Sequence, residues 1–399
     1  MKRVLLAGTA VVLALSMTSC SLFHNLSEAS KEAEKKSRQH TSMPTRNTEE
    51  TSEEYVTTET TEDPNLHVCD SVDEADVFLF LQEAVDNKWD RIRVKKDVTI
   101  NWIDFKSLDY GAFWLENLGI LQIDDVYDDY YLYYHDYDDE KIERMKAEID
   151  ESSDYIISCI PEGADEWESA LVVHDELIKM CTGLGLDADS TDENSDGYFQ
   201  ADAYGPLGVK KATCCGYTSA FVMIMNRIGI PCRLVESENH AWVWMGDDPS
   251  CGYIDVFWDD YGYVDTSGEA VIGHIYFGMT DEEQRRIGDH EIEYVSKAPG
   301  YVEAPIDSYY EHEGYYMEDY SFSEFCRIAK EEYNNGMASL EIKMADEDDY
   351  IRCKNDLNDG YTYADFLWAI QYNDDSYELT SQNEGIYVII ILLNIDNDF

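Results

Sequence analysis

The chain has 399 residues, of which 44% are hydrophobic and 13% aromatic, enough apolar material for two or three compact domains. It carries 84 acidic and 29 basic side chains, giving a net charge of −55 at pH 7. Such a charge repels nucleic acids and anionic lipid, so nucleic-acid binding is excluded first and basic polypeptides or cations are favoured as partners.

An export signal is predicted at the N-terminus. A basic start at residues 1–3 precedes an apolar stretch at 4–17, which is shorter than the ~20 residues of a membrane-spanning helix. The small residues directly before Cys20 resemble a lipobox. We therefore expect residues 1–19 to be a lipoprotein signal peptide and Cys20 to carry lipid. A bacterial protein of this kind is anchored outside the cytoplasmic membrane by lipid only; an uncleaved anchor and plain secretion are the alternatives.

Residues 20–65 are predicted to be a disordered linker. They are rich in Ser, Thr, Glu and Lys and nearly free of large apolar side chains, so they cannot bury enough surface to offset the entropy of ordering. The sequence has 10 cysteines, an odd number of which follow Cys20. If one is a catalytic thiol, the others could pair as disulfides in an exported protein. The alternative, given equal weight, is that the cysteines are free and buried.

Two similar α/β modules are expected, at residues 66–160 and 296–399. In each, a capping-box sequence opens an amphipathic helix that is followed by a strand with alternating apolar residues. In the first module the helix begins near Ser71 and the strand contains Ile92 and Val94. In the second the helix begins near Ser321 and the strand contains Leu340, Ile342 and Met344. Further helices are expected at 107–118 and 363–370. The tyrosine-rich stretch 127–137 predicts strands, with a glycan-binding surface as the alternative, and 386–393 predicts a buried strand.

The central region opens with an amphipathic helix from Asp165 to Cys181, capped by Asp165 with Glu168. His174 lies on its apolar face and is interpreted as a core residue. The following acidic loop places Asp192, Asn194 and Asp196 at alternate positions, as in the first half of a calcium-binding EF-hand loop. The twelfth position lacks the required carboxylate, so an ordinary acidic surface loop is expected and calcium is the weaker alternative.

A second helix is predicted to begin at Cys214 and to end before Gly229. At a helix N-terminus, unpaired backbone N–H groups and the helix dipole favour the thiolate, and the same N–H groups can hold an oxyanion. His240 begins the strand 240–244, and Asp255 lies in the strand 253–258. Neighbouring antiparallel strands can hold an imidazole and a carboxylate side by side, which gives a nucleophile, a base and an orienting acid.

The segments at 214–217 (CCGY), 229–233 (GIPCR), 240–242 (HAW) and 254–259 (IDVFWD) resemble the transglutaminase-like superfamily in order and spacing, over residues 165–290. The resemblance implies an α+β fold with a papain-like core at residues 161–295, in which a helix bearing the nucleophile packs on an antiparallel sheet. It implies that the nucleophile is Cys214, the base His240 and the base's partner Asp255. Tyr204 is a weak candidate for stabilising the oxyanion. Cys215 departs from the usual pattern and leaves a redox role for the pair open.

The resulting expectation is a cofactor-independent thiol enzyme that acts on peptide or carboxamide bonds through a thioester on cysteine. Peptidase or deamidase activity is ranked slightly ahead of crosslinking. The expected partner is a polypeptide, such as a cell-envelope or host protein. A catalytically inert surface lipoprotein that binds or adheres to a ligand is the alternative from another class of function.

Overall fold

The computed structural model describes most of the chain after residue 65. The described residues are 66–123, 125–181, 199–246, 252–265, 267–287, 290–297, 300, 302, 306–336, 339–372, 377–382 and 386–393. The predicted export signal, Cys20 and the linker lie outside them, as do the calcium-ligand candidates Asp192, Asn194 and Asp196. Within the described part, no helix is long and apolar enough to cross a membrane.

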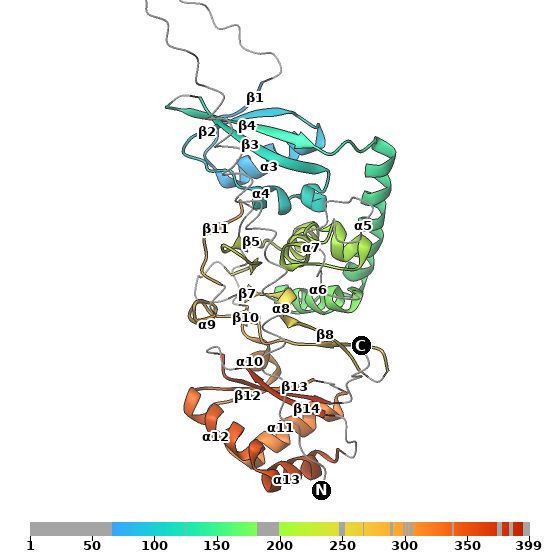
Figure 1. Ribbon diagram of the computed structural model, residues 1–399, viewed down its shortest axis with the longest axis vertical. Helices are drawn as coiled ribbons and strands as arrows, with labels where there is room; N and C mark the ends of the chain where they lie inside the picture. The colour runs from blue at the N-terminus through green and yellow to red at the C-terminus, as the bar shows by residue number, and fades with distance from the viewer. Residues whose placement is uncertain are drawn as a thin grey trace, which may run out of the picture.

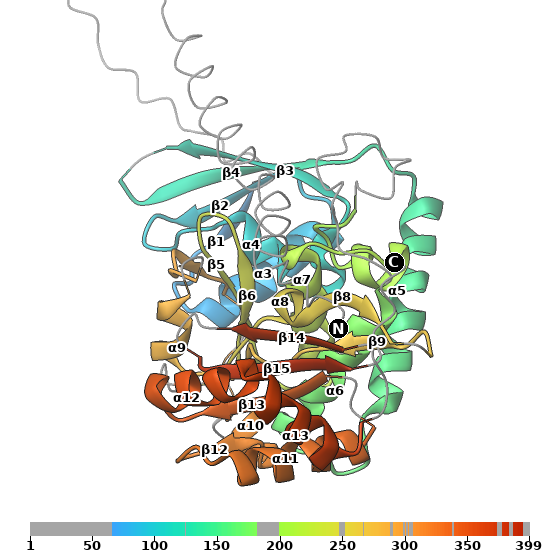
Figure 2. The same cartoon turned by 60° about the horizontal axis from the view of Figure 1, so that its bottom comes forward.

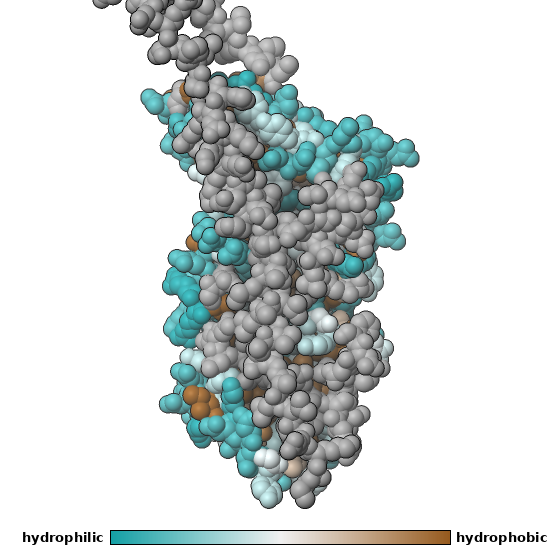
Figure 3. Space-filling view, viewed as in Figure 1, coloured by the Kyte–Doolittle hydropathy of each residue, from teal (hydrophilic) through white to brown (hydrophobic). Residues whose placement is uncertain are grey.

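The protein has the α+β architecture expected, with three main sheets that follow one another along the long axis (Figure 1). The N-terminal and C-terminal sheets lie at the two ends, and the central sheet lies between them. The 21-residue helix α5 (Asp139–Cys159) runs along one side and contacts α6 (Glu166–Met180). Where the described surface is visible in Figure 3, it is mostly hydrophilic, with small separate apolar patches.

The N-terminal sheet has the strand order β1-β2-β4-β3. Strands β1 and β2 are parallel and are connected by α3, whereas the other pairs are antiparallel. The elements are β1 (His67–Cys69), α3 (Glu74–Asp86), β2 (Arg91–Lys95), α4 (Trp102–Lys106), the 3₁₀ turn η1 (Asp109–Ala112), β3 (Leu115–Gln122) and β4 (Tyr127–Tyr134). The helix predicted near Ser71 is confirmed, although its cap is Asp73, whose carboxylate accepts the N–H groups of Ala75 and Asp76.

The C-terminal sheet repeats this plan with the strand order β12-β13-β15-β14. Its first pair is parallel and connected by α11, and its other pairs are antiparallel. The elements are α10 (Tyr309–Glu313), β12 (Tyr316–Met317), α11 (Phe322–Asn334), β13 (Ser339–Met344), α12 (Glu347–Asn358), α13 (Gly360–Ile370), β14 (Tyr377–Gln382) and β15 (Val388–Leu393). The two sheets therefore share the same strand order and the same pattern of parallel and antiparallel pairs.

Strand β13 is buried on both of its faces, although an alternating strand usually has one face in solvent. Helices α11 to α13 cover one face of the sheet (Figure 2), and the opposite face turns toward the central region. There Glu341 accepts the hydroxyl groups of Tyr261 and Tyr310, and Lys343 pairs with Glu283. The polar residues of the alternation thus form the contact with the central region.

The helix predicted at 107–118 is wrong. Helix α4 ends at Lys106, η1 follows, and β3 begins at Leu115. Gly111 has φ +59° and adjoins the central helix α7 so closely that a Cβ atom would lie 2.5 Å from the hydroxyl oxygen of Ser219. Packing against α7 therefore determines the backbone here. The tyrosine-rich stretch forms β4, as predicted.

The central sheet has the order β10-β7-β6-β5-β11, and all of its strand pairs are antiparallel. Helix α7 packs on β5 and β6 and is buried from its first residue through Met225, so a helix lies on an antiparallel sheet as expected. The elements are α6, η2 (Gly205–Val209), α7 (Cys214–Arg227), β5 (Arg233–Glu236), β6 (Ala241–Trp244), β7 (Tyr253–Ile254), α8 (Val256–Asp259), β8 (Asp260–Val264), β9 (Ala270–Ile272), β10 (Phe277–Met279), α9 (Asp281–Arg286) and β11 (Tyr294–Val295).

The strand predicted at 253–258 is only partly correct. Strand β7 ends at Ile254, and one turn of helix, α8, follows. The reason is local: the Asp255 carboxylate accepts the backbone N–H of Trp258 at 3.1 Å and caps this turn.

The eight cysteines within the described residues are all free thiols, and all but Cys159 are buried. Of the two alternatives left open by the sequence, free buried cysteines therefore apply to this part of the chain.

Candidate active site

Cys214 is the first residue of α7, as predicted. The preceding residue, Thr213, provides no side-chain cap; its hydroxyl donates instead to the backbone oxygen of Gln200, at 3.3 Å. The first-turn N–H groups are therefore not occupied by the side chain of the cap residue, and Cys214 lies at the positive end of the helix dipole. This is the environment that a thiolate and an oxyanion require.

Gly216 allows the segment 199–202 to pack directly against this first turn. A Cβ atom at Gly216 would lie 2.1 Å from the backbone oxygen of Gln200. The same oxygen accepts the N–H of Thr213 at 2.9 Å. The close packing thus requires a glycine two residues after Cys214, and this packing holds the first turn of α7, which carries the thiol, against the segment 199–202.

His240 and Asp255 are held side by side by the neighbouring strands β6 and β7, as expected. A turn from Ser237 to His240 precedes β6, with the His240 N–H donating to the Ser237 hydroxyl at 3.1 Å. Asp255 directly follows β7, which pairs with β6 in antiparallel fashion. Nε2 of His240 is hydrogen-bonded to Oδ2 of Asp255.

The buried position of this pair shifts both pKa values. Burial lowers the pKa of His240, but the Asp255 carboxylate and the Cys214 sulfur raise it to about 10. Burial also raises the pKa of Asp255, but His240 and then His290 hold it well below its usual range. Because Nε2 of His240 faces Asp255, Nδ1 is the nitrogen that remains for the hydrogen bond with Cys214. The geometry therefore favours a protonated imidazole between a carboxylate and a sulfur.

A second histidine, which the sequence analysis did not identify, completes the site. Nε2 of His290 is 3.0 Å from the same Asp255 oxygen that bonds His240. The His290 ring meets the His240 ring edge-on at 5.1 Å, and meets Trp242 and Trp258 at 4.5 and 4.6 Å. Both tryptophans also stack on His240. His290 follows α9, far from the other motifs, so no local pattern indicates its role.

Cys215 has a different environment from Cys214. Burial raises the pKa of the Cys215 thiol well above its usual range, and Lys106 is the nearby charge that opposes this effect. Lys106 is buried and paired with Asp202, and burial lowers its pKa to about 8. His240 forms its hydrogen bond with Cys214, so the imidazole serves the first sulfur of the pair.

The hydroxyl of Tyr204 donates to the carboxylate of Glu148 on α5. Its ring packs against Phe113 and Phe199. The structure therefore directs the Tyr204 hydroxyl to α5, and Tyr204 is not among the residues brought together around Cys214.

The three site residues are each only 1% exposed. A surface cavity of about 570 Å³ lies between the end of α5 and the start of α6, lined by residues that include Ile157, Asp165 and Ile230. None of the three site residues lines it, so it is a separate feature.

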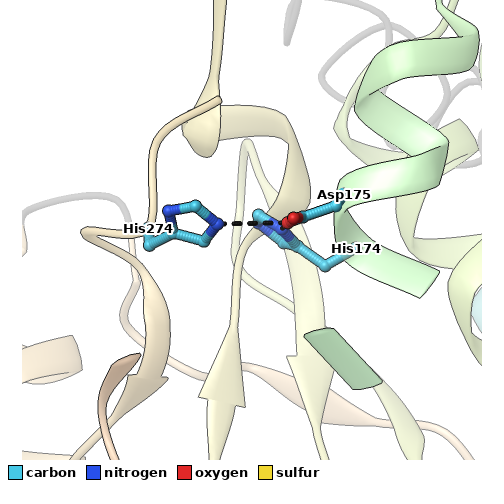
Figure 4. A group of neighbouring side chains, drawn as sticks. All are labelled: His174, Asp175 and His274. Atoms are coloured by element: carbon cyan, nitrogen blue, oxygen red, sulfur yellow. Dashed lines mark hydrogen bonds and ion pairs between the residues drawn. The ribbon is translucent and has the colours of Figure 1, made fainter. Parts of the chain in front are cut away.

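Two groups of side chains in the described residues could hold a metal ion. One consists of His240, Asp255 and His290, and therefore coincides with the site above. The other consists of His174, Asp175 and His274 (Figure 4).

Comparison with known proteins assigns this region to a family. Residues 179–267 match the model of the transglutaminase-like superfamily, and this segment contains Cys214, His240 and Asp255. The protein thus has a transglutaminase-like domain. A solved structure titled "Crystal structure of a TGase" is similar at 15% identity and a TM-score of 0.24, over 42% of this chain and 50% of that chain. The chain therefore spans half the length of that structure. No curated protein matches.

Proposed function

We propose that the protein is a thiol enzyme that transfers the acyl group of a peptide or carboxamide bond, with Cys214 as nucleophile, His240 as acid and base, and Asp255 as the residue that orients His240. The single observation that carries the proposal is the chain of contacts from the sulfur at the start of α7 through the imidazole to the buried carboxylate. The match of residues 179–267 to the transglutaminase-like superfamily supports it.

In the first half-reaction, the Cys214 thiolate attacks the carbonyl carbon and forms a tetrahedral oxyanion. The N–H groups of the first turn of α7 stabilise this oxyanion, because they lie next to Cys214 in the chain and are not occupied by the side chain of the cap residue. The carbon–nitrogen bond then breaks, and the protonated His240 gives its proton to the departing amine or ammonia. The products are a thioester and a neutral imidazole.

In the second half-reaction, His240 removes a proton from the acyl acceptor, which attacks the thioester. The thiolate departs and the imidazolium is restored. Water as acceptor gives peptide cleavage or deamidation, and an amine gives a crosslink. We place water slightly ahead of an amine, as the resemblance to the transglutaminase-like superfamily implies in the sequence analysis.

The N-terminal sequence supports a location outside the cytoplasmic membrane with lipid attached to Cys20, which would place the enzyme near cell-envelope or host polypeptides. Mass spectrometry of the N-terminal fragment tests this part separately. A diacylated Cys20 is expected, and an unmodified Met1 would contradict it.

The reaction is tested by incubating the wild-type protein with a mixed peptide library and a tagged amine. Cys214→Ala should abolish cleaved, deamidated or tagged products. Cys215→Ala is the matched control, a vicinal buried thiol whose removal should leave the products in place. Equal product formation by wild type and Cys214→Ala would contradict the proposal and favour the alternative of an inert binding protein.

A further inference from the structure

A second group of titratable side chains lies at the junction of the central region and the C-terminal module (Figure 4). His174 and Asp175 belong to α6, and His274 lies between β9 and β10. Oδ1 of Asp175 is 2.9 Å from Nδ1 of His174 and 3.1 Å from Nε2 of His274. One carboxylate oxygen therefore faces two imidazole nitrogens contributed by two separate elements.

The other nitrogen of His174 is held by a second carboxylate. Nε2 of His174 is 3.2 Å from Oδ2 of Asp259, and Asp259 in turn accepts the backbone N–H of Tyr276 at 3.1 and 3.2 Å. Asp259 is fully buried. Because Asp259 holds Nε2, Nδ1 is the nitrogen that faces Asp175, and a metal ion bound there would replace the proton of that hydrogen bond. A carboxylate behind a histidine is the arrangement that fixes the tautomer and orientation of a metal-binding imidazole.

His274 is oriented by packing. Its ring stacks on Tyr309 with a centroid distance of 3.9 Å and an interplanar angle of 11°. Its backbone N–H donates to Glu341 at 3.0 Å. Nδ1 of His274 is buried without a hydrogen-bond partner in the described part of the chain, so the stacked tyrosine rather than a polar contact directs Nε2 toward Asp175.

The spacing of these three donor atoms suits a small cation. They lie within 4.8 Å of one another, and the two closest pairs are 2.9 and 3.1 Å apart. Ligands at ~2.0–2.1 Å from a tetrahedral zinc ion are separated by about 3.3 Å, so the two closest pairs are near this separation and the third pair must approach it when an ion binds. Two imidazoles with one carboxylate favour a transition metal over calcium, which prefers oxygen ligands alone.

Exposure distinguishes this group from the similar one at the active site. The side chain of Asp175 is 23% exposed, so it offers an entry path and a position for a solvent ligand. In contrast, His240, Asp255 and His290 are at most 1% exposed.

From this geometry we propose that His174, Asp175 and His274 form a binding site for a divalent transition-metal ion such as zinc. The ligands are Nδ1 of His174, Nε2 of His274 and a carboxylate oxygen of Asp175, and solvent completes the coordination. The ion joins α6 to the loop before β10.

This site has a structural consequence for the neighbouring elements. Asp259, which supports His174, is the last residue of α8, and Asp255 is the cap of the same turn. Glu341, which holds the backbone of His274, belongs to β13 of the C-terminal module. An ion at this junction therefore stabilises both the attachment of the C-terminal module and the turn that carries the carboxylate of the active site.

The proposal is tested by metal binding to the full chain after removal of metals with a chelator. Calorimetry with Zn²⁺ should show one equivalent bound, and Zn²⁺ should raise the melting temperature. The absorption spectrum with Co²⁺ should have the bands of nitrogen and oxygen ligands in a tetrahedral field, without sulfur-to-cobalt charge transfer. This spectrum requires no variant. Absence of one-equivalent binding, or a sulfur-to-cobalt band, would overturn the proposal.

The variants His274→Gln and Asp175→Asn locate the site. Each should weaken Zn²⁺ binding by at least about 10- to 100-fold, the loss that follows even the removal of an outer-shell partner. The matched control is His312→Gln, because His312 is an exposed histidine whose Nδ1 also lies 3.1 Å from a carboxylate, that of Glu313. It should retain full binding. Unchanged affinity in both cluster variants, with native circular dichroism, would refute the assignment, as would loss of binding in His290→Gln alone.

Discussion

Replacing Asp255 by asparagine tests the electrostatic design of the site. Oδ2 of Asp255 bonds two imidazole nitrogens, and Oδ1 caps α8. Asparagine keeps the shape and one acceptor oxygen, so the turn should still form, but the negative charge is lost. The perturbation therefore removes the charge that holds a proton on His240.

The size of the effect follows from the pKa of His240. Burial lowers this pKa, yet Asp255 and then Cys214 raise it from 6.5 to about 10. At ~1.36 kcal/mol per pKa unit, the site stabilises the imidazolium by roughly 5 kcal/mol relative to a free histidine. Once the Asp255 charge is gone, burial dominates and His240 becomes neutral near pH 7. We expect kcat to fall about 10³- to 10⁴-fold, as in the corresponding change of a Ser-His-Asp triad.

The assay is the rate of product formation from a peptide identified in the library, measured for wild type and Asp255→Asn. Asp260→Asn is the control, because this neighbouring carboxylate accepts the hydroxyl of Tyr217 at 2.6 Å instead of an imidazole of the site. It should retain kcat within a few-fold. A kcat for Asp255→Asn within threefold of wild type would refute the reasoning.

Three further predictions concern the surroundings of the site. His290→Gln should lower kcat by up to about 100-fold with little change in KM, because it loosens Asp255 without touching the substrate; a change in KM alone would contradict a positioning role. Gly216→Ala should destabilise the fold by about 1–3 kcal/mol or more in urea unfolding, because its Cβ would lie 2.1 Å from a backbone oxygen, whereas Gly360→Ala meets no atom within 4 Å and should be neutral or stabilising. The raised pKa of His240 contributes stability that is complete below pH 6.5 and lost as the pH rises toward about 10. The unfolding free energy of wild type relative to His240→Gln should therefore decline by several kcal/mol across this range, and a flat difference would contradict the ion pair.

Elements with their own caps could be predicted from the sequence. The starts of α6 and α11 are predictable because their side-chain caps, Asp165 and Ser321, are local signals. Helix α7 also begins where predicted, at Cys214. Helix α5 has the same kind of local signal, in the helical spacing of Ile142, Met145, Ile149 and Ile156.

The errors occur where distant parts of the chain determine the structure. The segment 107–118 contains helix-like spacing, but its backbone at Gly111 follows the surface of α7. The early end of β7 at Ile254 is the exception, because its cause is local: the Asp255 carboxylate caps the turn that follows. His290 reaches the site only through the fold, because a lone histidine 35 residues beyond Asp255 has no local signature.

The most direct measurement is the reaction of the full chain with a small thiol electrophile across pH, with modified sites identified by mass spectrometry. An activated thiolate predicts rapid labelling at Cys214 that persists well below the ~8.5 pKa of a free thiol and slows in His240→Gln. Slow labelling that is spread over several cysteines and follows the titration of an ordinary thiol would contradict the account.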